Sequence, residues 1–124
     1  MADYKAEVVE SSRQLTARER IKFKDLTDAV SIDTATKDEA IFIEVKDYAI
    51  VKVHNDNSDN KEYTKYVLED KDGTLYATGS ESFWKSFKDI WDEMENETEE
   101  WTLKIYKKDS ANYKGKQFIT CSIV

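Results

Sequence analysis

Tyrosine and lysine side chains recur together along this chain, and together they are suited to binding nucleic acid. A groove that follows a single strand needs aromatic rings on which bases stack and cations that contact phosphates. Residues 101–124 hold five lysines and one acid, Asp109, although the whole chain has a formal net charge of −7. We therefore expect a nucleic-acid-binding surface formed by Lys52, Tyr66, Tyr76, Lys104, Tyr106, Lys107, Lys108, Tyr113, Lys114 and Lys116.

A simpler explanation of the same residues stays open at this point. Tyrosine is a common strand residue, and lysine on the solvent side of a sheet keeps the sheet soluble. The segment Tyr113-Lys114-Gly115-Lys116 could then be an ordinary exposed hairpin loop. A binding surface requires the tyrosines and lysines to cluster on one face, whereas an ordinary soluble sheet does not.

Catalytic patterns are missing from the sequence. The chain has one histidine, His54, and one cysteine, Cys121, which is too few for the usual zinc sites and excludes an internal disulfide. Cys121 lies among apolar residues and is expected to be a small buried hydrophobic side chain. No glycine-rich phosphate-binding motif occurs. We expect a binding protein, not an enzyme, with no metal and no cofactor.

Length and composition limit the possible number of domains and the cellular location. A chain of 124 residues most often forms one domain, and the absence of proline with only three glycines argues against long linkers. No apolar run is long enough to span a membrane, and the N-terminus lacks a signal-peptide pattern. We expect a soluble cytoplasmic protein that does not bind membranes. The oligomeric state and the preference between DNA and RNA stay open.

The clearest predicted element is an amphipathic helix over residues 80–94. Ser80 is a good N-cap, and apolar residues then recur at helical spacing. These residues are Phe83, Phe87, Ile90 and Met94. Such a stripe needs a sheet or barrel to cover it.

Strand patterns flank this helix. Alternation predicts one long bent strand over 41–54 with a bulge at Lys46-Asp47, then strands over 63–69, 74–78, 101–106 and 117–124. Asp70 to Gly73 has the sequence of a hairpin turn. This order favours a mainly β, α+β fold, an OB-fold-like five-stranded barrel over 36–124 with the helix between its third and fourth strands. A generic α+β sandwich is the alternative.

Residues 1–35 are expected to be an extension packed on that domain. Residues 4–10 alternate like a strand, and Thr16 and Glu19 have capping-box spacing. Ile21-Lys22-Phe23, however, alternates like a strand again.

Two segments resemble a known family. "TGSESFW" at 78–84 and "NYKGKQFITCSI" at 112–123 are similar to small phage and prophage single-stranded DNA-binding proteins of Gram-positive bacteria. The resemblance extends from about Leu15 to the end of the chain. It implies binding to single-stranded DNA in phage DNA replication or recombination, within the host cytoplasm. The loop 107–116 would then border the bound strand.

The acidic segment 89–100 carries seven acids and no base. This segment could contact a phage or host replication or recombination protein. Small size and acidity also fit a second hypothesis, a phage accessory protein that binds and inhibits a host protein such as a defence nuclease. A solvated surface is the simplest explanation of such a charge run.

Overall fold

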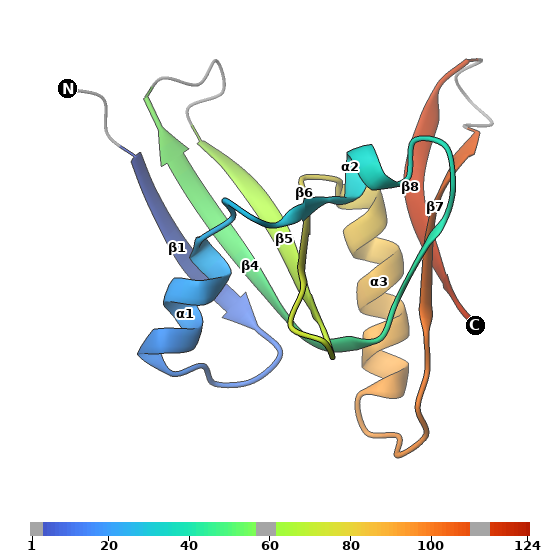
Figure 1. The fold of residues 1–124 in the computed structure, drawn as a ribbon, viewed down its shortest axis with the longest axis horizontal. Coiled ribbons are helices and arrows are strands. Elements are labelled where there is room, and N and C mark those ends of the chain that lie inside the picture. The colour runs from blue at the N-terminus through green and yellow to red at the C-terminus, as the bar shows by residue number, and fades with distance from the viewer. Residues whose placement is uncertain (1–3, 57–61, 110–114) are drawn as a thin grey trace. The chain divides into compact units, whose positions relative to one another are not determined.

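The protein is mainly β, as predicted, with three helices in the part that the structure describes (Figure 1). The computed structural model describes residues 4–56, 62–109 and 115–124. The strands are β1 (Tyr4–Ser11), β2 (Val30–Ser31), β3 (Ile41–Ile43), β4 (Val45–Asn55), β5 (Glu62–Asp70), β6 (Leu75–Thr78), β7 (Leu103–Asp109) and β8 (Gln117–Ile123). The helices are α1 (Ala17–Lys24), α2 (Ile32–Ala35) and α3 (Glu81–Met94).

The strands form two sheets, with orders β1-β4-β5-β6-β2 and β3-β7-β8, and they do not close into a barrel. The chain accordingly divides into two compact units. The first unit contains Met1–Ser31 and Lys46–Gly79, and the second contains Ile32–Val45 and Ser80–Val124. The predicted division into an extension of 1–35 and a barrel of 36–124 stays a prediction.

The predicted long strand over 41–54 is in fact two strands in different sheets. β3 pairs antiparallel with β7, whereas β4 pairs antiparallel with β1. Glu44 separates them, so the chain changes sheet there, whereas Lys46 and Asp47 lie within β4. The two halves of this run therefore serve different sheets, and the arrangement is consistent with an OB-like α+β fold that is not a closed barrel.

The core of the first unit lies between the sheet and α1. Along β4, alternate residues Ala49, Val51 and Val53 are buried. They pack with Leu15, Phe23, Val67 and Ala77 in one apolar cluster. Alternation of this kind buries one face of a strand and leaves the other outside.

The capping box at Thr16 and Glu19 is confirmed, and it begins α1. The Thr16 side chain accepts from the Glu19 backbone N–H, and the Glu19 carboxylate accepts from the Thr16 N–H. The apparent strand alternation at Ile21–Phe23 is therefore overridden by a helix. Phe23, 1% exposed, anchors that helix to the core.

Arg13 ties this helix start to β4. Its guanidinium donates to both carboxylate oxygens of Glu19 and, through Nε at 3.1 Å, to Oδ2 of Asp47. Asp47 is 6% exposed, and Ser12 Oγ donates to its other oxygen at 2.8 Å. The buried carboxylate is thus satisfied on both oxygens, as a buried charge requires.

In the second unit, α3 begins after its predicted N-cap, since the Ser80 side chain accepts from the Phe83 N–H. Phe83 and Phe87 are fully buried, and their rings stack with centroids 5.9 Å apart. On β8, Ser82 Oγ donates to the Ile119 carbonyl, and Ser86 Oγ lies 3.2 Å from Thr120 Oγ1. Two serines one turn apart therefore fix the helix to this strand.

We expect Phe87→Ala to lower the free energy of unfolding by about 3–5 kcal/mol, because it removes a fully buried ring and leaves a cavity. Urea titration followed by tryptophan fluorescence measures the change. Lys85→Ala, on the exposed side of the same helix, should change stability by less than about 0.5 kcal/mol. A loss below about 1 kcal/mol for Phe87→Ala would contradict a core position.

Acid should weaken the Arg13–Glu19 contact. Hydrogen bonding from Arg13, then from Thr16, lowers the pKa of Glu19 from 4.5 to about 2. A lowered pKa means that its stabilisation is complete above pH 4.5 and is lost as the pH falls through about 2. Glu19→Gln keeps the capping geometry without the titration. Its unfolding midpoint in urea should therefore fall less steeply than that of the wild type over this interval, and parallel curves would contradict the assignment.

Candidate nucleic-acid interface

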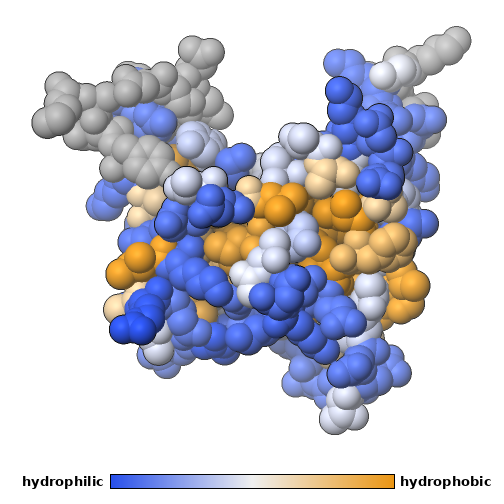
Figure 2. Space-filling view, viewed as in Figure 1, coloured by the Kyte–Doolittle hydropathy of each residue, from blue (hydrophilic) through white to orange (hydrophobic). Residues whose placement is uncertain are grey.

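The sheet of the second unit has one buried face and one open face. Leu103 and Ile105 of β7 are fully buried, and Ile119 and Cys121 of β8 are nearly so. The residues between them in sequence point to the opposite face. Phe42 is 57% exposed and Phe118 is 37% exposed on this side. Figure 2 shows hydrophobic residues reaching the surface over this sheet.

Strand register brings rings and lysines together on the open face. Phe42 of β3 pairs with Lys104 of β7, and Lys108 of β7 pairs with Phe118 of β8. Tyr106 lies between the two lysines on β7 and pairs with Thr120. Directly paired side chains on one face lie close enough to touch. We call this set, Phe42, Lys104, Tyr106, Lys108 and Phe118, the aromatic face.

Two contacts orient the central tyrosine of the aromatic face. Lys104 Nζ lies 5.1 Å from the centroid of the Tyr106 ring, within the range of a cation–π contact. The Tyr106 hydroxyl lies 3.1 Å from Ser122 Oγ, so one of the two donates to the other. The ring is held at both ends while remaining half-exposed.

Three predicted residues, Lys104, Tyr106 and Lys108, therefore lie together on the aromatic face. Lys107 pairs with Ile119, points to the opposite side of β7 and is half-buried. Lys116 is exposed and follows Gly115, whose φ of 81° confirms that the turn uses the conformational freedom of glycine. Tyr113 and Lys114 lie outside the described residues.

Phe42 and Phe118 were not among the predicted binding residues. Each occupies the outward phase of an alternating strand, where a soluble sheet normally places polar residues. That mismatch was visible in the sequence, since Phe42 alternates with Ile41 and Ile43. An aromatic residue in the polar phase is therefore the signal that could have identified them.

The remaining predicted residues, Lys52, Tyr66 and Tyr76, belong to the first unit. Tyr66 is only 9% exposed, so its ring offers little surface to a base. Tyr76 is half-buried, and burial, with a smaller contribution from Asp70 and Asp72, raises the pKa of its hydroxyl above the ordinary value. Lys52 is exposed.

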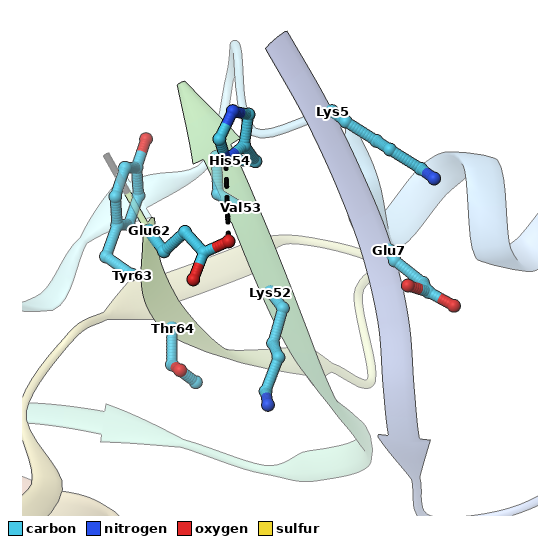
Figure 3. Close-up of a pocket in the computed structure, with 8 residues that line it drawn as sticks. All are labelled: Lys5, Glu7, Lys52, Val53, His54, Glu62, Tyr63 and Thr64. Atoms are coloured by element: carbon cyan, nitrogen blue, oxygen red, sulfur yellow. Dashed lines mark ion pairs between the residues drawn. The ribbon is translucent and has the colours of Figure 1, made fainter. Parts of the chain in front are cut away.

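Lys52 lines a groove of about 560 Å³ on the sheet of the first unit (Figure 3). The groove is formed by Lys5, Glu7, Lys52, Val53, His54, Glu62, Tyr63 and Thr64. His54 Nε2 lies 2.9 Å from Asp56 Oδ1, and its Nδ1 lies 3.5 Å from Glu62 Oε1. Two lysines face two glutamates there, so the groove favours a phosphate less than the aromatic face does.

The thiol of Cys121 is unsuited to act as a nucleophile. It lies on the buried face of β8, and burial raises its pKa to about 12. It therefore stays protonated near neutral pH, as expected for a small buried hydrophobic residue. Within the described ranges, no three histidine, cysteine or acidic side chains come together to hold a metal ion.

None of the described helices has both the length and the apolar composition needed to cross a membrane.

Comparison with known proteins identifies a family. The model of the family described as Phage Single-stranded DNA-binding protein, of Phi29 type, matches residues 3–124. No curated protein and no solved structure matches the chain. The match includes every strand and helix described above, together with all five residues of the aromatic face. The chain therefore belongs to the phage single-stranded DNA-binding protein family.

Proposed function

We propose that this protein coats single-stranded DNA during phage DNA replication or recombination in the host cytoplasm, and that it catalyses no reaction. The observation that carries the proposal is the aromatic face, where three partly exposed rings alternate with two lysines across three hydrogen-bonded strands. Membership of the family supports the class of ligand. The local lysines explain how a chain of net charge −7 can attract a polyanion.

On the proposed path, bases stack on Phe42, Tyr106 and Phe118. Lys104, Lys108 and Lys116 contact the phosphates between them. Stacking accepts any base, and lysine contacts only the backbone, so sequence preference should be small. Duplex DNA keeps its bases paired and stacked inside, and it should bind more weakly.

The other predicted binding residues do not belong to the aromatic face. Lys107, towards the end of β7, would border the bound DNA strand, and so would Tyr113 and Lys114, which lie outside the described residues. A phosphate contact by Lys52, which lies in the first unit, is a separate expectation. A contact by Tyr66 or Tyr76 stays a prediction, and the burial of Tyr66 favours a packing role for that ring.

Loss of one stacking ring should weaken binding without changing its salt dependence. We expect Tyr106→Ala and Phe42→Ala each to cost about 1–3 kcal/mol of binding free energy. Fluorescence anisotropy with a labelled oligonucleotide, titrated at several salt concentrations, measures both quantities. Tyr106→Phe is the matched control, since it keeps the ring and removes only the hydroxyl that contacts Ser122.

If both alanine variants bind the oligonucleotide as tightly as the wild type does, the DNA strand binds elsewhere on the molecule. If the wild-type protein binds no single strand even at low salt, the proposal is wrong. The hypothesis of an acidic inhibitor of a host protein would then take precedence.

Loss of lysines, in contrast, should change the salt dependence of DNA binding. Lys104→Ala combined with Lys108→Ala should flatten the plot of log binding constant against log salt by about 1.4, since each phosphate contact to a single strand contributes about 0.7. Lys114→Ala combined with Lys116→Ala tests the segment beside β8 in the same way. A control pair, Lys37→Ala with Lys85→Ala, removes equal charge from exposed positions outside the proposed path. An equal change of slope in the control pair would show a general charge effect and not local contacts.

A further inference from the structure

Helix α1 is a basic surface that the aromatic face does not include. Four of its eight residues are basic, Arg18, Arg20, Lys22 and Lys24. Phe23 is its buried residue, while Ile21 is 63% exposed. Arg18 and Lys24 stand three positions before and after Ile21, so they flank it on the helix surface. We call Arg18, Ile21 and Lys24 the basic face of α1.

The contacts around α1 leave this face positively charged. Glu19, the acid within the helix, accepts from the guanidinium of Arg13. Lys22 pairs with Glu69, and Arg20 donates to the Leu15 carbonyl at 2.7 Å. No ion pair is recorded for Arg18 or Lys24 within the part of the chain that the structure describes. These two cations therefore remain available for a partner.

The far end of α3 has the opposite character. Seven acids and no base lie between Asp89 and Glu100, and Glu93, Glu95, Glu97 and Glu99 are exposed. Figure 2 shows a hydrophilic surface over the turn that follows α3. Half-exposed apolar residues also occur there. The rings of Trp91 and Trp101 meet edge to face at 6.3 Å. We call residues 91–101 the acidic end of α3.

Helix electrostatics disfavour this arrangement in an isolated chain. The C-terminus of a helix carries partial negative charge, which cations stabilise and acids destabilise. The last turn of α3 has no basic residue, and Glu95 is its C-cap. Cations brought to this end by a partner would relieve the repulsion.

We propose that the basic face of α1 on one copy binds the acidic end of α3 on the next copy along the same DNA strand. This inference rests on the proposed function. Arg18 and Lys24 would meet the glutamates, and Ile21 would meet the apolar edge of Trp91 and Trp101. A DNA backbone fits the basic face less well, because an exposed isoleucine lies at its centre and α1 offers no exposed ring for stacking.

The geometry of such a contact suits a coating protein. It joins two different surfaces, so each copy can bind one neighbour through α1 and another through α3. Exposed ion pairs are individually weak, so copies free in solution associate little. Binding side by side on one strand raises their effective concentration, and the contact then makes DNA binding cooperative.

The test uses two charge-reversed proteins. The first carries Arg18→Glu and Lys24→Glu. The second carries Glu93→Lys, Glu95→Lys, Glu97→Lys and Glu99→Lys, which leaves four lysines and two acids at the acidic end of α3. Affinity is measured on the shortest oligonucleotide that binds one copy, and cooperativity on a long single strand. Each variant should bind the short oligonucleotide within about twofold of the wild type, because neither touches the aromatic face. On the long strand, each should lose cooperativity by about tenfold or more.

An equimolar mixture of the two variants is the decisive measurement. In an alternating array every junction again joins opposite charges, so the mixture should regain wild-type cooperativity. The control protein, with Lys37→Glu and Lys85→Glu, should keep its cooperativity. A mixture no more cooperative than either variant would overturn the proposal, and so would weaker binding of the first variant to the short oligonucleotide, which would assign α1 to DNA.

Sedimentation at low salt without DNA separates this proposal from the proposed function. The mixture should form heterodimers and longer species at concentrations where each variant alone stays monomeric. If the wild type binds no DNA but the mixture associates, the proposed function fails while the contact between copies stands. If the mixture does not associate at the highest attainable concentration and shows no cooperativity, the contact itself is wrong.

Discussion

The candidate interface depends on burial of one phase of β7. Leu103 and Ile105 are fully buried, and their burial fixes the register in which Lys104, Tyr106 and Lys108 must face outward. A slip of one residue would reverse every side chain of the strand and place lysines in the core. The apolar phase therefore does more than stabilise the second unit. It decides which side chains the sheet presents to solvent.

Local signals in the sequence predicted the elements that local interactions form. The N-cap at Ser80, the aromatic stripe of α3 and the capping box at Thr16 all depend on residues within one or two helical turns. The turn at Asp70–Gly73 is equally local, with Gly73 at a φ of 92° and its N–H bonded to the Asp70 carbonyl. These predictions succeeded because no distant partner is needed to explain them.

Failures arose where distant partners decide the outcome. Alternation runs almost without a break from Ile41 to His54, so nothing local shows that β3 pairs with β7 while β4 pairs with β1. At Ile21–Phe23 three residues of alternation were weaker evidence than the cap that precedes them. The burial of Tyr66 follows from tertiary packing, which composition cannot show. The predicted site draws residues from both units and stays a prediction, while the strand register places Lys104, Tyr106 and Lys108 on one face of one sheet.

Charge segregation gives the molecule two electrostatic characters. The segment 101–124 attracts a polyanion locally, while the acidic segment 89–100 repels one. The two segments are adjacent in sequence. A DNA strand would therefore have favourable electrostatic energy beside the first segment only. An acidic average is therefore compatible with DNA binding, and it disfavours nonspecific contact by the rest of the surface.

Cys121 also offers a built-in reporter of motion. It is the one cysteine of the chain, it lies in the buried phase of β8, and its thiol stays protonated near neutral pH. A thiol reagent can reach it only when β8 separates from its surroundings, and the rate of labelling then measures how often that strand opens. Because β8 also carries Phe118, slower labelling of the DNA-bound protein would link occupation of the open face to rigidity of the buried one.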